Sequence, residues 1–110
     1  MSKERQSKWR RTLKGRFVFT ARKAAERRIP FKLTLEGFSD LVKDPCRYCG
    51  AALSATGSGL DRKDSYLGYT LDNCVPCCTV CNRIRGKDSI SYSEMFEVIK
   101  LLRQLRSVTA

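Results

Sequence analysis

The chain contains no histidine, only three prolines and a single tryptophan among its 110 residues. Without histidine, no imidazole is available as a general base, so hydrolytic chemistry would need another proton acceptor. The chain also lacks an apolar run near the roughly 20 residues that cross a bilayer, and its charged start, MSKERQSKWRR, is unlike a secretory signal. We therefore expect one small, soluble, intracellular domain.

Acidic residues are few, and they are fewest in the N-terminal part of the chain. The chain has 11 acids against 22 lysines and arginines, but up to Lys32 there are 12 basic residues and only 2 acids. From Leu33 onward, 10 basic residues meet 9 acids. A positive segment that also carries Trp9 and Phe17 fits the phosphate backbone of a nucleic acid, although a solvated basic tail has a similar composition. We favour a nucleic acid as the partner.

The six cysteines are confined to 36 consecutive positions. Cys46-x2-Cys49 and Cys78-x2-Cys81 form two pairs separated by 28 residues. This spacing is typical of a tetrahedral four-thiolate site for a structural zinc ion, one per chain. In a reducing compartment, closely spaced thiols are more often metal ligands than disulfides.

Cys74 and Cys77 are a further pair with the same two-residue spacing. We assign zinc to Cys78 and Cys81 because that pair is expected to open a helix, whereas Cys77 follows Pro76 in an extended run. The other two thiols are then packed side chains, or ligands of a second metal shared with a partner chain.

The N-terminal part of the chain predicts helices. Apolar residues every four positions, with no proline before Pro30, predict a basic helix over about residues 7–28. Thr34 can cap a second short helix. We expect residues 1–45 to form a basic helical arm that binds DNA.

The remaining residues, 46–110, are expected to form the zinc-bound core, which ends in a packing helix. The segments LDRKD and CVPC indicate two short strands, and CTVCNRIRG indicates a helix that ends at Gly86. Ser91 and Glu94 form a capping box for a packing helix over about 92–106. The apolar stripe of this helix also suits a homodimer.

The order of motifs from Cys46 to about Ser89 resembles the HNH, or ββα-metal, nucleases of the His-Me finger fold: CRYCG, GLDRKD, GYTLDN and VPCCTVCNRIRGKD. The resemblance is strongest to the branch with Asp-Arg in place of Asp-His, which includes PacI-type restriction enzymes and small phage proteins. It implies an α+β fold, in which zinc stabilises a ββα unit flanked by the arm and a C-terminal helix. It also implies a metal-dependent DNA endonuclease in the cytoplasm of a bacterium or a phage-infected host cell.

The resemblance implies the residues of the site as well. Asp61 matches the metal-binding acid and Asn82 its partner ligand, and a carboxylate with an amide oxygen suits Mg²⁺, with Mn²⁺ as a substitute. Asn73 matches the middle asparagine of the family, which braces the turn and orients the catalytic strand. An ordinary turn residue is the other interpretation of Asn73.

Arg62 stands where the family has its histidine, but a guanidinium keeps its proton at any working pH. We expect Arg62 to grip the scissile phosphate instead. The proton acceptor is then Tyr48, Asp64 or metal-bound water, and we favour Tyr48 among the tyrosines because zinc would bring it near Asn82. A packed aromatic is the other interpretation of Tyr48. In a regular strand Asp61 and Arg62 point to opposite faces, so one site can use both only if the strand is irregular or the phosphate lies over its edge.

Basic residues of the arm and of the helix after the last thiol are the predicted phosphate contacts: Arg10, Arg11, Arg16, Arg83, Arg85 and Lys87. The absence of histidine also supports an alternative function, a catalytically inactive zinc ribbon that only binds nucleic acid. An active enzyme would nick one strand, or cut both as a dimer.

Overall fold

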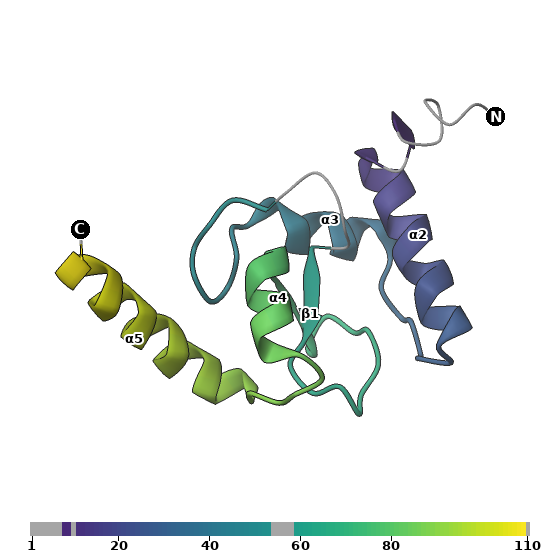
Figure 1. Ribbon diagram of the computed structural model, residues 1–110. Helices are drawn as coiled ribbons and strands as arrows, with labels where there is room; N and C mark the ends of the chain where they lie inside the picture. The colour runs from purple at the N-terminus through teal and green to yellow at the C-terminus, as the bar shows by residue number, and fades with distance from the viewer. Residues whose placement is uncertain (1–7, 10, 54–58, 110) are drawn as a thin grey trace.

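The computed structural model describes residues 8–9, 11–53 and 59–109, which fold as an α+β chain (Figure 1). Its named elements, in chain order, are α2 (Leu13–Glu26), α3 (Leu35–Lys43), β1 (Leu60–Arg62), β2 (Cys74–Pro76), α4 (Thr79–Arg85) and α5 (Tyr92–Thr109). The hairpin and α4 lie in the middle, with α2 and α5 at opposite ends (Figure 1). No helix in the described ranges is long and apolar enough to cross a membrane.

Threonine caps fix where the first two helices begin. The Thr12 hydroxyl accepts a hydrogen bond from the Gly15 amide at 3.0 Å, so α2 begins at Leu13, later in the chain than the sequence predicted. The Thr34 hydroxyl accepts from the Gly37 amide at 3.0 Å and starts α3, as predicted.

The last two helices also follow their sequence signals. The Cys78 side chain caps α4, which ends at Gly86 with a φ of 58° that favours glycine. Ser91 and Glu94 form the expected capping box: the Ser91 amide donates to Glu94 Oε1 at 2.9 Å, and the Glu94 amide donates to Ser91 Oγ at 3.1 Å. Helix α5 reaches Thr109, beyond the predicted end.

The hairpin is antiparallel, with Leu60 opposite Pro76, Asp61 opposite Val75 and Arg62 opposite Cys74. Within the described residues both strands are edges, which is where a proline is tolerated. Because side chains alternate along a strand, Leu60 and Arg62 share one face and Asp61 points to the other.

Apolar residues around the cysteines form the first of two hydrophobic cores, which we call the knuckle cluster. Its buried members come from the thiol pairs, β2 and α5: Cys46, Tyr48, Val75, Cys77, Cys81, Met95 and Ile99. Helix α5 thus packs its apolar stripe against the predicted zinc site, while Leu101 and Leu105 farther along it are exposed.

The second core, the aromatic cluster, joins the N-terminal helices to the hairpin. It consists of four buried residues with three aromatic rings against them: Leu33, Phe38, Leu60 and Cys74, and Phe17, Phe31 and Tyr69. The ring of Phe17 lies 5.6 Å from that of Phe31 and 5.7 Å from that of Phe38, and Phe31 lies 5.5 Å from Tyr69, between centroids. This core crosses the predicted division at residue 45, so the basic helix is packed onto the rest of the domain.

Candidate functional site

Four cysteines form a group that can hold a metal ion. The Sγ atoms of Cys46, Cys49, Cys78 and Cys81 all lie within 4.8 Å of one another, and those of Cys49 and Cys78 are 3.7 Å apart. Tetrahedral zinc with bonds of about 2.3 Å requires sulfur atoms about 3.8 Å apart, so the group fits this ion. Among the described residues, the metal-binding group contains the two pairs predicted for zinc, without Cys74.

The pKa values of two of these thiols are shifted in opposite directions. Burial raises the pKa of Cys46, but backbone hydrogen bonds from Cys49 and Cys78 outweigh it and lower that pKa to about 6. At Cys81, burial and the neighbouring thiols raise the pKa instead. Four thiolates so close together need a positive ion to balance their charge, because each one opposes ionisation of the next.

A cavity of about 310 Å³ brings together three of the five predicted catalytic residues, without Tyr48 and Asn73. Asp61 and Arg62 from β1 and Asn82 from α4 line it, and Lys87 lies at the end of α4. Its other wall is α2. Asp61 and Arg62 therefore open onto one cavity although their side chains leave opposite faces of the strand.

Asp61 is buried, with 8% of its surface exposed, and its contacts lie on the knuckle side of the hairpin. Its Oδ2 accepts a hydrogen bond from the Tyr48 hydroxyl at 2.5 Å and forms a short ion pair with Arg85. These two partners hold the carboxylate in one orientation.

Arg62 lies on the other face of β1 and holds the turn that follows the strand. Its Nη1 donates to the carbonyl oxygens of Ser65 at 2.7 Å and Leu67 at 2.9 Å, and its guanidinium stands 5.3 Å from the centre of the Tyr69 ring. The guanidinium is thus anchored beside the cavity.

Asn73 makes a set of hydrogen bonds within the same turn. Its Oδ1 accepts from the Asp64 amide at 3.1 Å, and its Nδ2 donates to the carbonyls of Asp64 at 3.0 Å and Gly68 at 2.9 Å. These contacts are those of a residue that braces the turn between β1 and β2.

Tyr48 does not have the properties of a general base. Burial raises its pKa, and the hydrogen bond to Asp61 and the charge of Asp61 raise it further. The phenol keeps its proton and donates it to Asp61, while its ring packs against Tyr92 and Phe96. These contacts argue against Tyr48 as the proton acceptor and fit its packed-aromatic interpretation.

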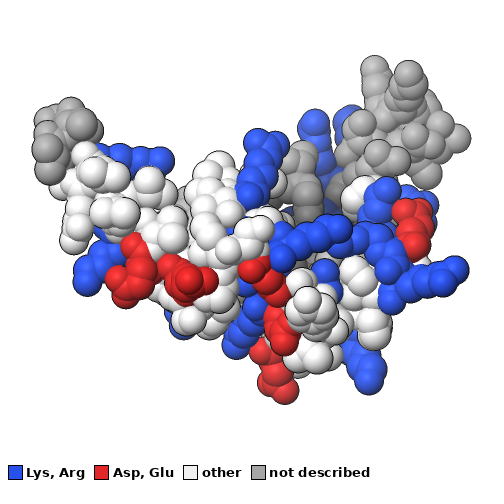
Figure 2. Space-filling view, turned by 60° about the horizontal axis from the view of Figure 1, so that its bottom comes forward, with Lys and Arg blue, Asp and Glu red and all other residues white. Residues whose placement is uncertain are grey.

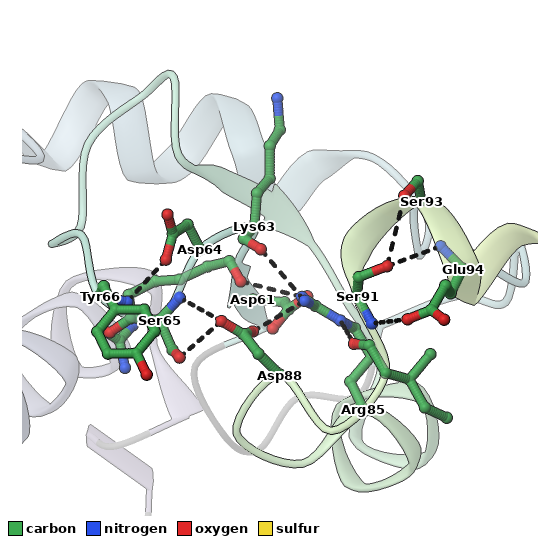
Figure 3. Close-up of polar contacts among 12 residues, drawn as sticks. Asp61, Lys63, Asp64, Ser65, Tyr66, Arg85, Asp88, Ser91, Ser93 and Glu94 are labelled. Atoms are coloured by element: carbon green, nitrogen blue, oxygen red, sulfur yellow. Dashed lines mark hydrogen bonds and ion pairs between the residues drawn. The ribbon is translucent and has the colours of Figure 1, made fainter.

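Arg85 is the clearest departure from the predicted site. We predicted that it contacts phosphate, but its side chain is 0% exposed, within a network of carboxylates and carbonyls at the centre of Figure 3. A phosphate cannot reach a guanidinium that is fully enclosed by protein. No local sequence signal distinguishes Arg85 from the exposed Arg83, because its partners Asp61, Arg62 and Lys63 lie on and directly after another element.

The other predicted phosphate contacts are divided among several places. Arg11, Arg83 and Lys87 are exposed, and Lys87 lines the cavity. Arg16 is partly buried and lines a different cavity of about 430 Å³ beside α3, and burial lowers its pKa. Arg10 lies outside the described residues.

Two basic residues, one in the last turn of α2 and one at its C-cap, line the cavity and were not predicted as contacts. Lys23 and Arg27 lie on the wall opposite Lys87, together with Phe19. Phe19, Lys23 and Arg27 follow one another at intervals of four residues, which places them on one helix face but does not show what that face meets. Figure 2 shows that Lys and Arg side chains are concentrated at the α2 end of the face in view.

Comparisons with known proteins bear on the fold. No protein-family model matches the chain. An uncharacterized protein, R423, of Acanthamoeba polyphaga mimivirus is 40% identical over 63 residues, which is 57% of this chain; the match spans only 12% of that protein's length. The solved structure of the rare-cutting HNH restriction endonuclease PacI superimposes with a TM-score of 0.69 and 21% identity, over 86% of this chain and 78% of that one. The chain thus shares the fold of an HNH endonuclease, as predicted.

Proposed function

We propose that this protein is a metal-dependent DNA endonuclease of the HNH type that hydrolyses phosphodiester bonds, and that it belongs to the Asp-Arg branch. The observation that carries the proposal is the cavity shared by Asp61, Arg62 and Asn82, with basic residues on its walls. The likeness to the fold of PacI, whose name describes an HNH restriction endonuclease, supports the same assignment.

In this proposal Asp61 and Asn82 would hold Mg²⁺, or Mn²⁺ in its place, through a carboxylate and an amide oxygen. Such an ion, when bound, neutralises charge on a phosphate and lowers the pKa of a coordinated water. A zinc ion on the four cysteines would tie the Cys46–Cys49 turn to the start of α4, and the ion pair of Arg85 with Asp61 joins α4 to β1, so the two ligands stay at the same cavity.

The cations around the cavity would bind the DNA backbone. Lys23 and Arg27 on one wall and Lys87 on the other can each contact a phosphate. Arg62, already fixed by the Ser65 and Leu67 carbonyls, would stabilise charge that develops on the scissile phosphate.

With Tyr48 protonated, the nucleophilic water would lose its proton either to Asp64 or, if a bound metal makes it acidic, to solvent. Asp64 is exposed on the turn, its Oδ1 accepts a hydrogen bond from the Tyr66 amide at 2.9 Å, and it is not among the described residues that line the cavity. We favour the second route, in which the metal would make the water acidic enough to lose its proton to solvent.

A supercoiled plasmid tests the function. With zinc-loaded protein and added Mg²⁺ we expect nicked circles, or linear DNA if a homodimer cuts both strands. Asp61→Ala should lower the nicking rate at least about 100-fold, because one of two protein ligands is lost. Asp40→Ala, which removes an exposed acid on α3, is the matched control and should nick like the parent. Mg²⁺ should be omitted rather than chelated, since a chelator would also remove zinc.

The alternative function is a catalytically inactive zinc ribbon that binds nucleic acid. The absence of histidine favours it, because no imidazole is available to act as a general base. Tight, salt-sensitive DNA binding without nicking in Mg²⁺ or Mn²⁺ would establish the alternative and exclude the endonuclease.

A further inference from the structure

Arg85 is the most completely enclosed charged side chain among the described residues. All three of its guanidinium nitrogens donate hydrogen bonds. Nε donates to the Ile90 carbonyl at 3.0 Å, and Nη2 to the Lys63 carbonyl at 3.2 Å and to Asp88 Oδ1 at 2.9 Å. Nη1 contacts Asp61 Oδ2 and donates to the Tyr48 hydroxyl at 3.1 Å and the Arg62 carbonyl at 3.0 Å.

These contacts tie together the two elements that carry the proposed metal ligands. Arg85 is on α4, three residues after Asn82 and therefore on a neighbouring part of the same helix surface. The groups that it binds on β1 and directly after it are the Asp61 carboxylate and the carbonyls of Arg62 and Lys63. One side chain thus sets the position of the strand relative to the helix.

The charges around Arg85 fit this role better than that of a simple packing residue. A buried guanidinium is costly unless carboxylates and carbonyls satisfy it, and an apolar side chain of similar size would pack without that cost. Asp88, the second carboxylate, accepts from Arg85 and also from the Ser65 amide and hydroxyl, both at 2.7 Å. The network therefore reaches from α4 through β1 to the turn held by Arg62 (Figure 3).

We propose that Arg85 is a positioning residue, which orients the Asp61 carboxylate and fixes its distance from Asn82 so that the pair can bind a divalent ion. This inference rests on the proposed function. It replaces the predicted phosphate contact of Arg85 with an action through Asp61, and the two roles predict different results when Arg85 is changed.

The experiment compares Arg85→Met with Arg83→Met, two residues apart on α4, one buried and the other exposed. Three quantities are measured on zinc-loaded protein: the rate of plasmid nicking, the salt dependence of DNA binding, and the affinity for Mn²⁺ by electron paramagnetic resonance. For Arg85→Met we expect nicking slower by about 100-fold and Mn²⁺ affinity lower by about 10- to 100-fold, with an unchanged salt slope. Arg83→Met should leave Mn²⁺ affinity unchanged and reduce the salt slope by about 0.9, the value of one phosphate contact.

A smaller salt slope for Arg85→Met with normal Mn²⁺ affinity would overturn the inference and restore a phosphate contact. Thermal unfolding and zinc content show whether each variant is folded. If Arg85→Met unfolds, Arg85→Lys and Asp88→Asn test the inference instead, because both variants keep a cation near Asp61. The inference then requires that Arg85→Lys weakens Mn²⁺ binding and that Asp88→Asn weakens it less.

The inference and the proposed function fail in different ways. A parent protein that binds Mn²⁺ through Asp61 but does not nick would contradict the endonuclease, and Arg85→Met would still test the positioning role by its Mn²⁺ affinity. A parent that shows no Mn²⁺ binding sensitive to Asp61→Ala would contradict both.

Discussion

The knuckle cluster and the aromatic cluster are both small cores, but they depend on different forces. The knuckle cluster surrounds four thiols that can hold a metal ion, whereas the aromatic cluster is built from rings in mutual contact. The hairpin lies between them: Leu60 belongs to the aromatic cluster, and Asp61 contacts Tyr48 of the knuckle cluster. The candidate site is therefore at the boundary of two cores, and each core controls one face of β1.

Loss of zinc should lower stability more than any other change, and unfolding should then begin in the knuckle cluster. Cys81→Ala removes one ligand, and zinc-linked folding is worth about 10 kcal/mol or more in small zinc domains, so we expect loss of bound zinc and of cooperative unfolding. Cys74→Ala, at a buried thiol of the aromatic cluster, should retain one zinc per chain. Metal analysis with thermal unfolding measures both. Loss of zinc from Cys74→Ala would indicate that the competing thiol pair binds metal.

The aromatic cluster can be weakened without touching the metal. Phe38 is 0% exposed and contacts the Phe17 ring, so Phe38→Ala should lower the free energy of unfolding by about 3–5 kcal/mol. The folded fraction should still bind one zinc ion, which urea unfolding and metal analysis would show. Zinc lost together with the aromatic core would mean that the two clusters cannot form separately.

The smallest effect concerns the cavity wall that the aromatic cluster holds in place. Lys23 and Lys43 are both in the last turn of a helix, and each has an exposed acidic partner three residues away at 3.4 Å, but only Lys23 lines the site cavity. Lys23→Gln should weaken DNA binding roughly threefold and lower the salt slope by about 0.9. Lys43→Gln should change both the DNA affinity and the salt slope by less. Equal effects in a fluorescence titration would show that only overall charge matters.

The comparison of the two clusters also shows what could be predicted from the sequence. Local signals gave correct predictions: the spacing of Cys46 and Cys49, the cap at Thr34 and the capping box at Ser91 each depend on residues only a few positions apart. The strand pair was also predicted, although β1 ends at Arg62 because the following turn is held by side chains.

Long-range contacts could not be predicted in the same way. Arg83 and Arg85 are the same amino acid two positions apart on α4. Arg83 is exposed, whereas Arg85 contacts the carboxylates of Asp61 and Asp88, which are 24 and 3 residues away in the chain. Similarly, nothing local shows that Lys23 lies across a cavity from Lys87. Both facts depend on how separate elements pack, and helix periodicity by itself carries no such information.

The link between α2 and the turn after β1 has no spare room. The Tyr69 amide donates to the Pro30 carbonyl at 2.9 Å, and an added Cβ at Gly68 would lie 2.5 Å from that same carbonyl oxygen. A single methyl group would therefore separate the two segments. For protein engineering this means that the basic helix is not an exchangeable cassette: a graft of another DNA-binding helix before residue 30 would have to reproduce the joint at Gly68, or it would displace the turn that anchors Arg62.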